Sequence, residues 1–259
     1  MNGIEAIIAG FIQGTIEWLP ISSEAQTMLF MLNQLNMDPQ TALSYAFYLH
    51  VGTMFAVVIK FKNEFYSVLK NFSINHKMTR ILIFATIFTG FTALPLYFAL
   101  KMVSFENSAA TFTLLIGLML IFTGLIMKKT GAFGDKDTQN LSDKDIVILG
   151  MAQGFAIIPG ISRSGVTVAT LLARNVKQES ALVISFLISV PATICIFCVD
   201  IDSIRLIPPG TMFLLTVSSF VFGYISMDFL LKFARKTPFW IFCIFLGLVT
   251  VVFVLIGYI

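Results

Sequence analysis

The sequence predicts an all-α integral membrane protein built as an inverted repeat, each half containing one re-entrant helical hairpin and three transmembrane helices. Hydrophobic residues make up 57% of the 259 positions and charged residues only 12%, about half the charge of a soluble domain. Long stretches are apolar on every side, unlike the amphipathic helices of a soluble core. Two similar polar motifs interrupt this pattern, one beginning at Gly10 and the other at Gly150.

Six stretches are long and apolar enough to cross a bilayer, which takes about 20 residues. We expect each to form a transmembrane helix. They cover residues 41–59, 81–100, 107–127, 180–199, 206–227 and 237–259. The cysteines lie inside these stretches, so we expect Cys195, Cys198 and Cys243 to be packing residues.

Two shorter and more polar segments are predicted to be re-entrant hairpins. Residues 4–34 contain Gly-x-x-Gln-Gly followed by Leu-Pro-Ile-Ser-Ser, and residues 146–174 contain Gly-x-x-Gln-Gly followed by Pro-Gly-Ile-Ser-Arg-Ser. Irregular backbone at membrane depth survives only where it is buried in protein or lines a cavity. Paired breaks of this kind indicate a binding site between the two halves.

The order of the segments predicts that the second half lies upside down relative to the first. Three spans separate the hairpins, and because three is odd the hairpins enter from opposite faces, so their tips can meet near the midplane. We expect a single polytopic domain with repeat one over residues 1–128, a solvated cytoplasmic linker over 129–145 and repeat two over 146–259.

Basic residues are distributed unevenly between the two sides of this arrangement. Most of the 17 Lys and Arg residues lie on one side, in loops near 60–80 and 128–145 among others. Loops rich in Lys and Arg stay in the cytoplasm. We therefore predict a multi-pass protein of the cell membrane with both termini extracytoplasmic. Topology and lipid contact explain the basic loops, and no nucleic-acid partner is expected.

Serines follow the break in each hairpin, where a helix N-cap is typical. They are Ser22 and Ser23 in the first hairpin and Ser162 in the second. Each returning helix would begin deep in the membrane with free N–H groups at its tip, which is an anion site. Ser23 has two interpretations: a nucleophile or phosphate ligand, or a cap whose capping box Gln26 completes.

Three further side chains carry the polar chemistry of these tips. Arg163 needs an anion or water nearby, because an isolated guanidinium at membrane depth is costly. It can bind a phosphate bidentately. Alternatively, it forms a structural pair with Glu17 or Glu24. Glu17 lies one turn from Gln13 on the same helix face. Its role stays open between metal ligand, positioner of water or phosphate, and partner of Arg163.

A serine nucleophile needs a base at neutral pH, and the sequence offers few. His76 lies in a basic loop, where we expect it to be solvated. His50 lies inside a predicted span, so it either lines the site or is satisfied by packing. Glu24 is the other candidate base.

Both motifs resemble signatures of the undecaprenyl-diphosphate phosphatase family, also called the bacitracin-resistance proteins. Residues 13–23 read Gln-Gly-Thr-Ile-Glu-Trp-Leu-Pro-Ile-Ser-Ser, similar to the family's glutamate-rich signature. Residues 159–167 read Pro-Gly-Ile-Ser-Arg-Ser-Gly-Val-Thr and match the family's second signature at every fixed position. The resemblance covers the whole chain in length, motif order and spacing.

This resemblance implies hydrolysis of a polyprenyl (undecaprenyl-type) diphosphate lipid to the monophosphate and inorganic phosphate. By position, Glu17 would be the essential acid, tied to substrate or to a divalent metal such as Mg²⁺ or Ca²⁺, Ser23 the nucleophile and Arg163 the diphosphate ligand. No organic cofactor is expected, and a homo-oligomer is compatible with the sequence. Further substrate-binding residues would be Gln13, Ser22, Ser162, Ser164, Gly165 and Thr167.

One departure from the family pattern affects the chemistry. Three residues after the paired serines the family usually has a histidine proposed as the acid/base, whereas this chain has Gln26, and glutamine cannot exchange protons at neutral pH. His50, in turn, lies where the family usually has a Gln-Leu-Gly stretch. Either the base has moved, to His50 or Glu24, or hydrolysis is slow or absent. The sequence therefore also admits a non-hydrolytic polyprenyl-phosphate transporter or flippase.

Overall fold

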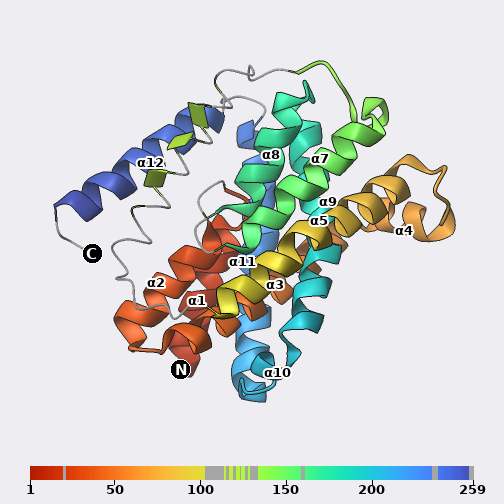
Figure 1. The fold of residues 1–259 in the computed structure, drawn as a ribbon. Coiled ribbons are helices and arrows are strands. Elements are labelled where there is room, and N and C mark those ends of the chain that lie inside the picture. The colour runs from red at the N-terminus through yellow and green to blue at the C-terminus, as the bar shows by residue number, and fades with distance from the viewer. Residues whose placement is uncertain are drawn as a thin grey trace.

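The computed structural model describes residues 1–19, 22–102, 134–158, 161–234 and 239–256, together with scattered positions from 114 to 128. This part of the chain is helical and contains no strand, only an isolated bridge between Lys136 and Val176. Figure 1 shows most helices packed side by side as one bundle, with α12 to one side. The predicted all-α fold class is confirmed.

The helices follow the order that the hydrophobic pattern predicts. The first half contains α1 (Gly3–Ile16), α2 (Ser23–Leu35), α3 (Pro39–Lys60), α4 (Lys62–Lys70) and α5 (Lys77–Met102). The second half contains the 3₁₀ turn η1 (Thr138–Asn140), α7 (Asp143–Gly154), the 3₁₀ turn η2 (Phe155–Ile157), α8 (Arg163–Ala173), α9 (Gln178–Val199), α10 (Ile201–Ile204), α11 (Pro209–Ala234) and α12 (Phe239–Leu255).

Four helices in the described part are long and apolar enough to cross a membrane. They lie in α3, α5, α9 and α11 and confirm four of the predicted spans, so the chain is a multi-pass membrane protein. The predicted span 107–127 lies mostly outside the described residues. The predicted span 237–259 corresponds to α12, which has 17 residues.

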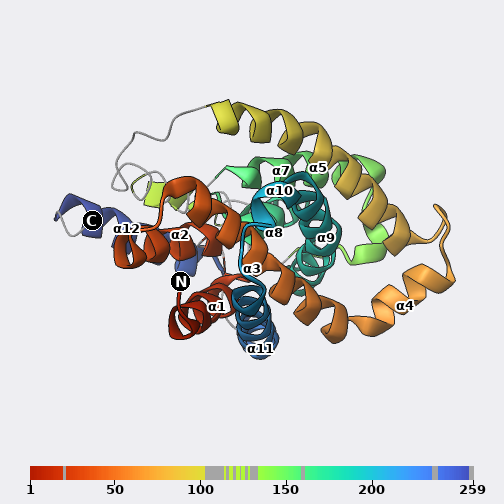
Figure 2. The same ribbon diagram turned by 90° about the horizontal axis from the view of Figure 1, so that it is seen from below.

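Both predicted hairpins correspond to pairs of consecutive helices in contact, while their re-entry into a membrane stays a prediction. The first consists of α1 and α2, and the second of α7, η2 and α8. The breaks expected at Pro20–Ile21 and Pro159–Gly160 lie outside the described residues. Viewed from below in Figure 2, α4 extends from the bundle on the side opposite to α12.

Each hairpin packs its ascending helix against a long helix of the other half. α1 lies along α11, and a Cβ added to Gly14 would come within 2.6 Å of the backbone nitrogen of Gly223. α7 lies along α5, and a Cβ added to Gly150 would come within 2.5 Å of the carbonyl oxygen of Ala85. Such small residues let membrane helices approach closely. The two hairpins are thus held in equivalent ways, while the upside-down relation of the halves stays a prediction.

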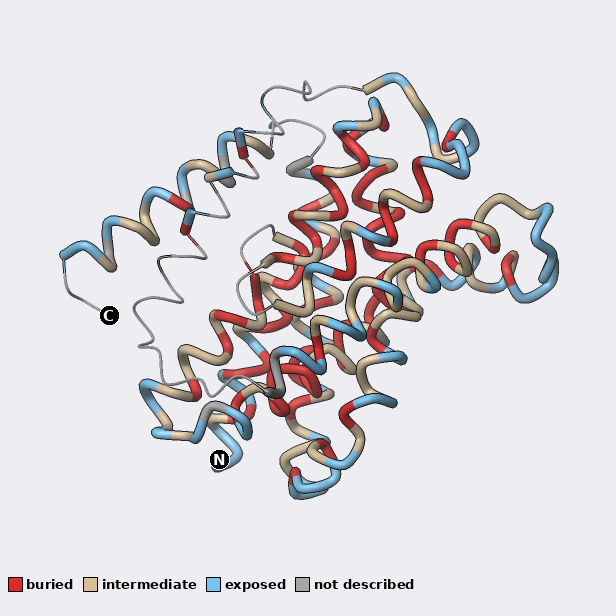
Figure 3. The backbone as a smooth tube through the Cα atoms, viewed as in Figure 1, coloured by how far each residue is buried: buried red, intermediate tan, exposed pale blue. Residues whose placement is uncertain are grey.

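The buried core lies where the hairpins meet α3, α9 and α11, as the red segments of Figure 3 show. Trp18, at the end of α1, packs edge-on against Phe186 of α9 with ring centroids 4.9 Å apart. Its indole N–H donates to the carbonyl oxygen of Gly223 in α11 at 2.9 Å. These contacts hold the first hairpin in place just before its break.

The predicted linker is described from residue 134 onwards. Asp135 and Asp137 are exposed, as expected. The segment is nevertheless attached to the chain at the end of the second hairpin. The backbone N–H of Lys136 donates to the carbonyl oxygen of Asn175, and that of Lys177 donates to the carbonyl oxygen of Lys136, each at 2.9 Å.

Candidate active site

Glu17 lies at the C-terminal end of α1, where the first hairpin begins to break. Its backbone N–H closes the last helical hydrogen bond, to the carbonyl oxygen of Gln13 at 2.9 Å. The side chain is only 3% exposed. A carboxylate buried this deeply is costly unless hydrogen bonds and opposite charge compensate it.

Four side chains contact the Glu17 carboxylate. At Oε2, Gln13 Nε2 donates at 2.7 Å, Ser23 Oγ donates at 2.5 Å, and His50 Nε2 lies at 3.4 Å. At Oε1, the guanidinium of Arg163 forms an ion pair and a hydrogen bond. These side chains come from α1, α2, α3 and α8, so the site brings both hairpins together, as the sequence predicts.

Ser23 reaches Glu17 because the residue before it caps α2. Ser22 is the N-cap, and its Oγ accepts from the N–H of Ala25 at 3.4 Å. The interpretation of Ser23 as the cap, with Gln26 completing its capping box, is therefore wrong. Ser22 has a φ of 50°, a left-handed conformation that is unusual outside glycine. This turn leaves the hydroxyl of Ser23 available to the carboxylate.

The second hairpin closes onto the first through two serines that donate to one carbonyl oxygen. Ser164 Oγ donates to the backbone of Leu19 at 2.8 Å, and Ser162 Oγ donates to the same oxygen at 3.3 Å. Ser162 also caps α8, as predicted, because its Oγ accepts from the N–H of Gly165 at 3.1 Å. The tips are thus joined at the backbone as well as through the ion pair.

Arg163 is held on its other side by α9. Its Nη1 donates to the carbonyl oxygen of Ser185 at 3.0 Å, and the hydroxyls of Ser185 and Thr167 share a hydrogen bond of 2.6 Å. The guanidinium therefore lies between a carboxylate and a backbone carbonyl, with the side chain 16% exposed. Sequence reasoning missed Ser185, because a serine within an apolar span gives no signal that separates it from a packing residue.

The candidate bases occupy different positions. His50 Nδ1 lies 2.9 Å from the carbonyl oxygen of Ala46. Because a carbonyl only accepts, Nδ1 carries a proton there and Nε2 faces Glu17. Glu24 Oε1 is buried without a hydrogen-bond partner in the described part of the chain, and Gln26 is not among the residues that line the site.

A polar pocket of about 20 Å³ lies between these groups. This volume holds about one water molecule. Its walls are formed by Glu17, Ser22, Ser23, Glu24, His50, Ala156, Ile161, Ser162 and Arg163. Four residues expected to bind substrate support the pocket from behind instead: Gln13, Ser164, Gly165 and Thr167.

The described residues do not form a protein cage for a metal. Within the residue ranges given above, no group of three or more His, Cys, Asp or Glu side chains is placed to hold a metal ion. Glu17 is committed to its four partners, which leaves Glu24 as the second carboxylate in the pocket wall. A Mg²⁺ or Ca²⁺ ion would therefore depend on oxygens supplied by a bound phosphate.

The fold and the site together define a multi-pass membrane protein with a buried Ser–Glu–Arg site between two broken helical hairpins. The chain belongs to the bacitracin resistance protein BacA family, whose model matches residues 6–252. An undecaprenyl-diphosphatase of Methanothrix thermoacetophila is 44% identical over 255 residues, which cover 96% of each chain. The undecaprenyl-diphosphatase of Haloarcula marismortui is 33% identical over 93% of each chain. That of Methanopyrus kandleri is 35% identical over 93% of this chain and 92% of the relative.

Proposed function

We propose that this protein is a membrane phosphatase that hydrolyses a polyprenyl (undecaprenyl-type) diphosphate to the monophosphate and inorganic phosphate, so that the lipid carrier can be used again. One observation carries the proposal: Ser23 Oγ donates to Glu17 at 2.5 Å while Arg163 holds the other oxygen of the same carboxylate. A nucleophile, a base and an anion ligand thus share one pocket. Relatives named undecaprenyl-diphosphatase support the same reaction and substrate.

The reaction would begin with attack of Ser23 Oγ on the terminal phosphorus, while the hydroxyl proton passes to Glu17 Oε2. The bond from that phosphorus to the bridging oxygen breaks, and the polyprenyl monophosphate leaves with the electron pair. Water then attacks the phosphoserine, inorganic phosphate departs and the serine regains a proton. Catalysis in such a transfer depends mainly on positioning and on charge stabilisation.

Arg163 has to exchange partners when substrate binds. The pocket of about 20 Å³ by itself has no room for a diphosphate, so the terminal phosphate reaches Ser23 when the guanidinium turns away from Glu17. The positive charge then compensates the diphosphate, which it can bind bidentately. The same movement frees the carboxylate to accept the proton from Ser23.

Glu17 needs a second group to take up the proton that it receives, and His50 is better placed for this than Glu24. Its Nε2 faces Oε2 of Glu17, the same oxygen that Ser23 contacts. It can take up the proton that Glu17 receives and later assist the attacking water. Glu24 also borders the pocket, and we keep it as the second candidate.

We further propose where the protein lies in the cell and what it binds besides the lipid. The bias of basic loops supports a location in the cell membrane with both termini extracytoplasmic. A Mg²⁺ or Ca²⁺ ion would enter together with the diphosphate oxygens, and the proposal includes no organic cofactor. A homo-oligomer stays compatible with it.

A non-hydrolytic polyprenyl-phosphate transporter is less well supported. The relatives carry the name of a hydrolase, and transport gives no reason for a serine hydroxyl to be held against a buried carboxylate.

Phosphate release tests the proposal directly. The purified protein in detergent is incubated with undecaprenyl diphosphate, beside Ser23→Ala, Arg163→Ala and the matched control Ser226→Ala, whose hydroxyl contacts Gly14 outside the site. We expect release by the wild type and the control, and a loss of about 10³-fold in Ser23→Ala. Equal release by Ser23→Ala would exclude the serine nucleophile. Absence of release from all four proteins, with lipid binding retained, would favour the transporter.

A further inference from the structure

A second and larger cavity, of about 400 Å³, adjoins the site. Glu24, His50 and Arg163 line both this cavity and the polar pocket, so a ligand at the site can extend directly into it. Cavities of this volume enclose small ligands or part of a larger one.

The walls of this cavity become apolar away from the site. α5 contributes Leu94, and α9 contributes Ile194 and Val199. These three side chains are 44%, 50% and 37% exposed. They lie on helices that are long and apolar enough to cross a membrane, so we expect their exposed surfaces to face hydrocarbon. The apolar end of the cavity therefore borders the lipid alongside α5 and α9.

Gly90 of α5 lines this cavity without any close neighbour. A Cβ added there would meet no atom within 4 Å, whereas one added to Gly14 or Gly150 would come within 2.6 and 2.5 Å of backbone atoms. Close helix packing therefore explains Gly14 and Gly150 but not Gly90. Glycine inside a helix costs about 0.5–1 kcal/mol relative to alanine, and one of its uses is to let a ligand approach the backbone.

The two helices that form the walls are also fastened to each other. The hydroxyl of Tyr97, which lines the cavity, donates to Oδ1 of Asp200 at 2.8 Å, and both residues are buried. This bond joins the C-terminal parts of α5 and α9. The walls of the cavity are therefore braced at this end, and such preorganisation lowers the cost of binding a flexible chain.

We propose that this cavity receives the isoprenoid chain of the substrate. The diphosphate lies at Ser23 and Arg163, the isoprene units beyond the first lie along Gly90, and the rest of the chain passes between α5 and α9 into the bilayer. The inference rests on the proposed function for the identity of the lipid. Its physical basis is the continuity of an apolar cavity with a charged site at one end and hydrocarbon at the other.

Filling the cavity tests this assignment. Gly90→Phe places a ring where the chain would lie, and Gly210→Phe is the matched control, because a Cβ at Gly210 in the first turn of α11 also meets no atom within 4 Å. We measure kcat/KM for undecaprenyl diphosphate and for isopentenyl diphosphate, which has a single isoprene unit. Gly90→Phe should lower the ratio of the two values at least about tenfold, and Gly210→Phe should leave it unchanged. An unchanged ratio in Gly90→Phe would overturn the proposal.

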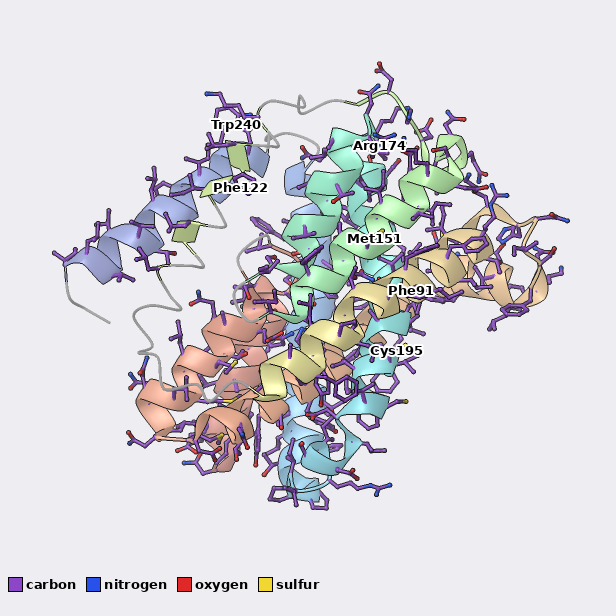
Figure 4. The ribbon with its side chains drawn as sticks, viewed as in Figure 1. Phe91, Phe122, Met151, Arg174, Cys195 and Trp240 are labelled. Carbon is purple, nitrogen blue, oxygen red and sulfur yellow. The ribbon has the colours of Figure 1, made fainter. Side chains whose placement is uncertain are left out.

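A binding measurement keeps the test independent of catalysis and of the folding of Gly90→Phe. Cys195 lines the same cavity and is exposed; Figure 4 labels it on α9. In the variant Cys198→Ser/Cys243→Ser, undecaprenyl monophosphate should slow the reaction of Cys195 with an apolar maleimide at least about fivefold. Inorganic phosphate should not slow it. Equal labelling rates with and without the lipid would overturn the tail site. Protection without any phosphate release by the wild type would overturn the proposed function and leave the tail site standing.

Discussion

The hydroxyl of Ser23 lies 2.5 Å from Oε2 of Glu17, and Arg163 of the opposite hairpin holds Oε1 of the same side chain. One buried carboxylate thus positions the nucleophile of the first hairpin and the cation of the second. Glu17 links the two halves structurally and is also the group that would accept the serine proton. The stability and the activity of the site therefore depend on the same residue.

Removing one partner of this ion pair should destabilise the protein more than removing both. Glu17→Gln leaves a buried guanidinium without its counter-charge, and breaking such a pair costs about 3–5 kcal/mol. Arg163→Met likewise leaves the buried Glu17 carboxylate without its counter-charge. We expect the double variant Glu17→Gln/Arg163→Met to recover most of the loss of thermal stability while phosphate release stays absent. Thermal unfolding in detergent measures the effect, and losses that simply add in the double variant would contradict a direct pair.

His50 should matter for the rate, and a histidine at position 26 should replace it in part. Because Nε2 of His50 faces Glu17, His50→Gln should lower kcat by about 10²-fold, the usual contribution of a positioned acid/base. Gln26 lies three residues after Ser23 on α2, so the two share a helix face. Adding Gln26→His to His50→Gln should raise kcat again by about tenfold.

The second histidine of the chain provides the control for this experiment. His76 lies in the connection between α4 and α5, where Nδ1 contacts the hydroxyl of Thr79 at 2.9 Å. His76→Gln should leave kcat unchanged. If His50→Gln behaves like His76→Gln while Glu24→Gln loses activity, the group that takes up the proton from Glu17 is Glu24 and not His50.

The meeting of Arg163 and Glu17 could be predicted from the sequence because neither charge is tolerable alone in a membrane. Two broken hairpins, the first with Glu17 and Glu24 near its tip and the second with Arg163, leave few arrangements in which the charges are compensated. The same argument requires His50, inside a predicted span, to face protein or water, but it leaves open whether the ring lines the site or only packs. The structure places its Nε2 3.4 Å from Glu17. An unpaired charge or polar ring has a high free energy in hydrocarbon. The residue types and the order of the apolar segments are enough to show which side chains face that cost.

Contacts that depend on backbone direction could not be predicted. Ser22 rather than Ser23 caps α2, because the chain takes a left-handed turn at Ser22 that no residue type there signals. The backbone carbonyl oxygen of Leu19 accepts from Ser164, and that of Ser185 accepts from Arg163. Every residue has such an oxygen, so the residue type does not indicate which one is used. The sequence motif therefore indicates the residues that carry charge, but not which of them line the pocket and which support it.

The glycines of the bundle should respond to alanine in opposite directions. Gly14→Ala and Gly150→Ala force a methyl group against backbone atoms at 2.6 and 2.5 Å, and such overpacking costs about 1–3 kcal/mol. Gly90→Ala meets open space and should stabilise α5 by about 0.5–1 kcal/mol through helix propensity. Thermal unfolding of the three variants checks this order. A loss in Gly90→Ala equal to that in Gly150→Ala would mean that α5 and its neighbours pack more tightly at Gly90 than the structure has them.

Asp145 stabilises the start of the second hairpin outside the spans. Its side chain is 1% exposed, and Arg174 Nε donates to its Oδ1 at 2.5 Å. Ser142 donates to Oδ2 from its hydroxyl at 2.8 Å and from its backbone N–H at 3.0 Å. Burial alone would raise the pKa of this carboxyl, but the hydrogen bonds from Arg174 and Ser142 outweigh burial and lower the pKa to about 2.

Acid should therefore weaken this end of the protein within a defined range of pH. A carboxyl whose pKa falls from 3.8 in the unfolded chain to about 2 in the folded one stabilises the fold above pH 3.8. That contribution, about 2 kcal/mol, is lost as the pH falls from 3.8 toward 2. Asp145→Asn lacks the titrating group, so its thermal stability should lie below that of the wild type at pH 6, and the difference should shrink below pH 4. The exposed Asp135→Asn serves as the control with no such convergence. A difference between wild type and Asp145→Asn that is the same at pH 6 and pH 3 would show that the carboxylate charge does not stabilise α7.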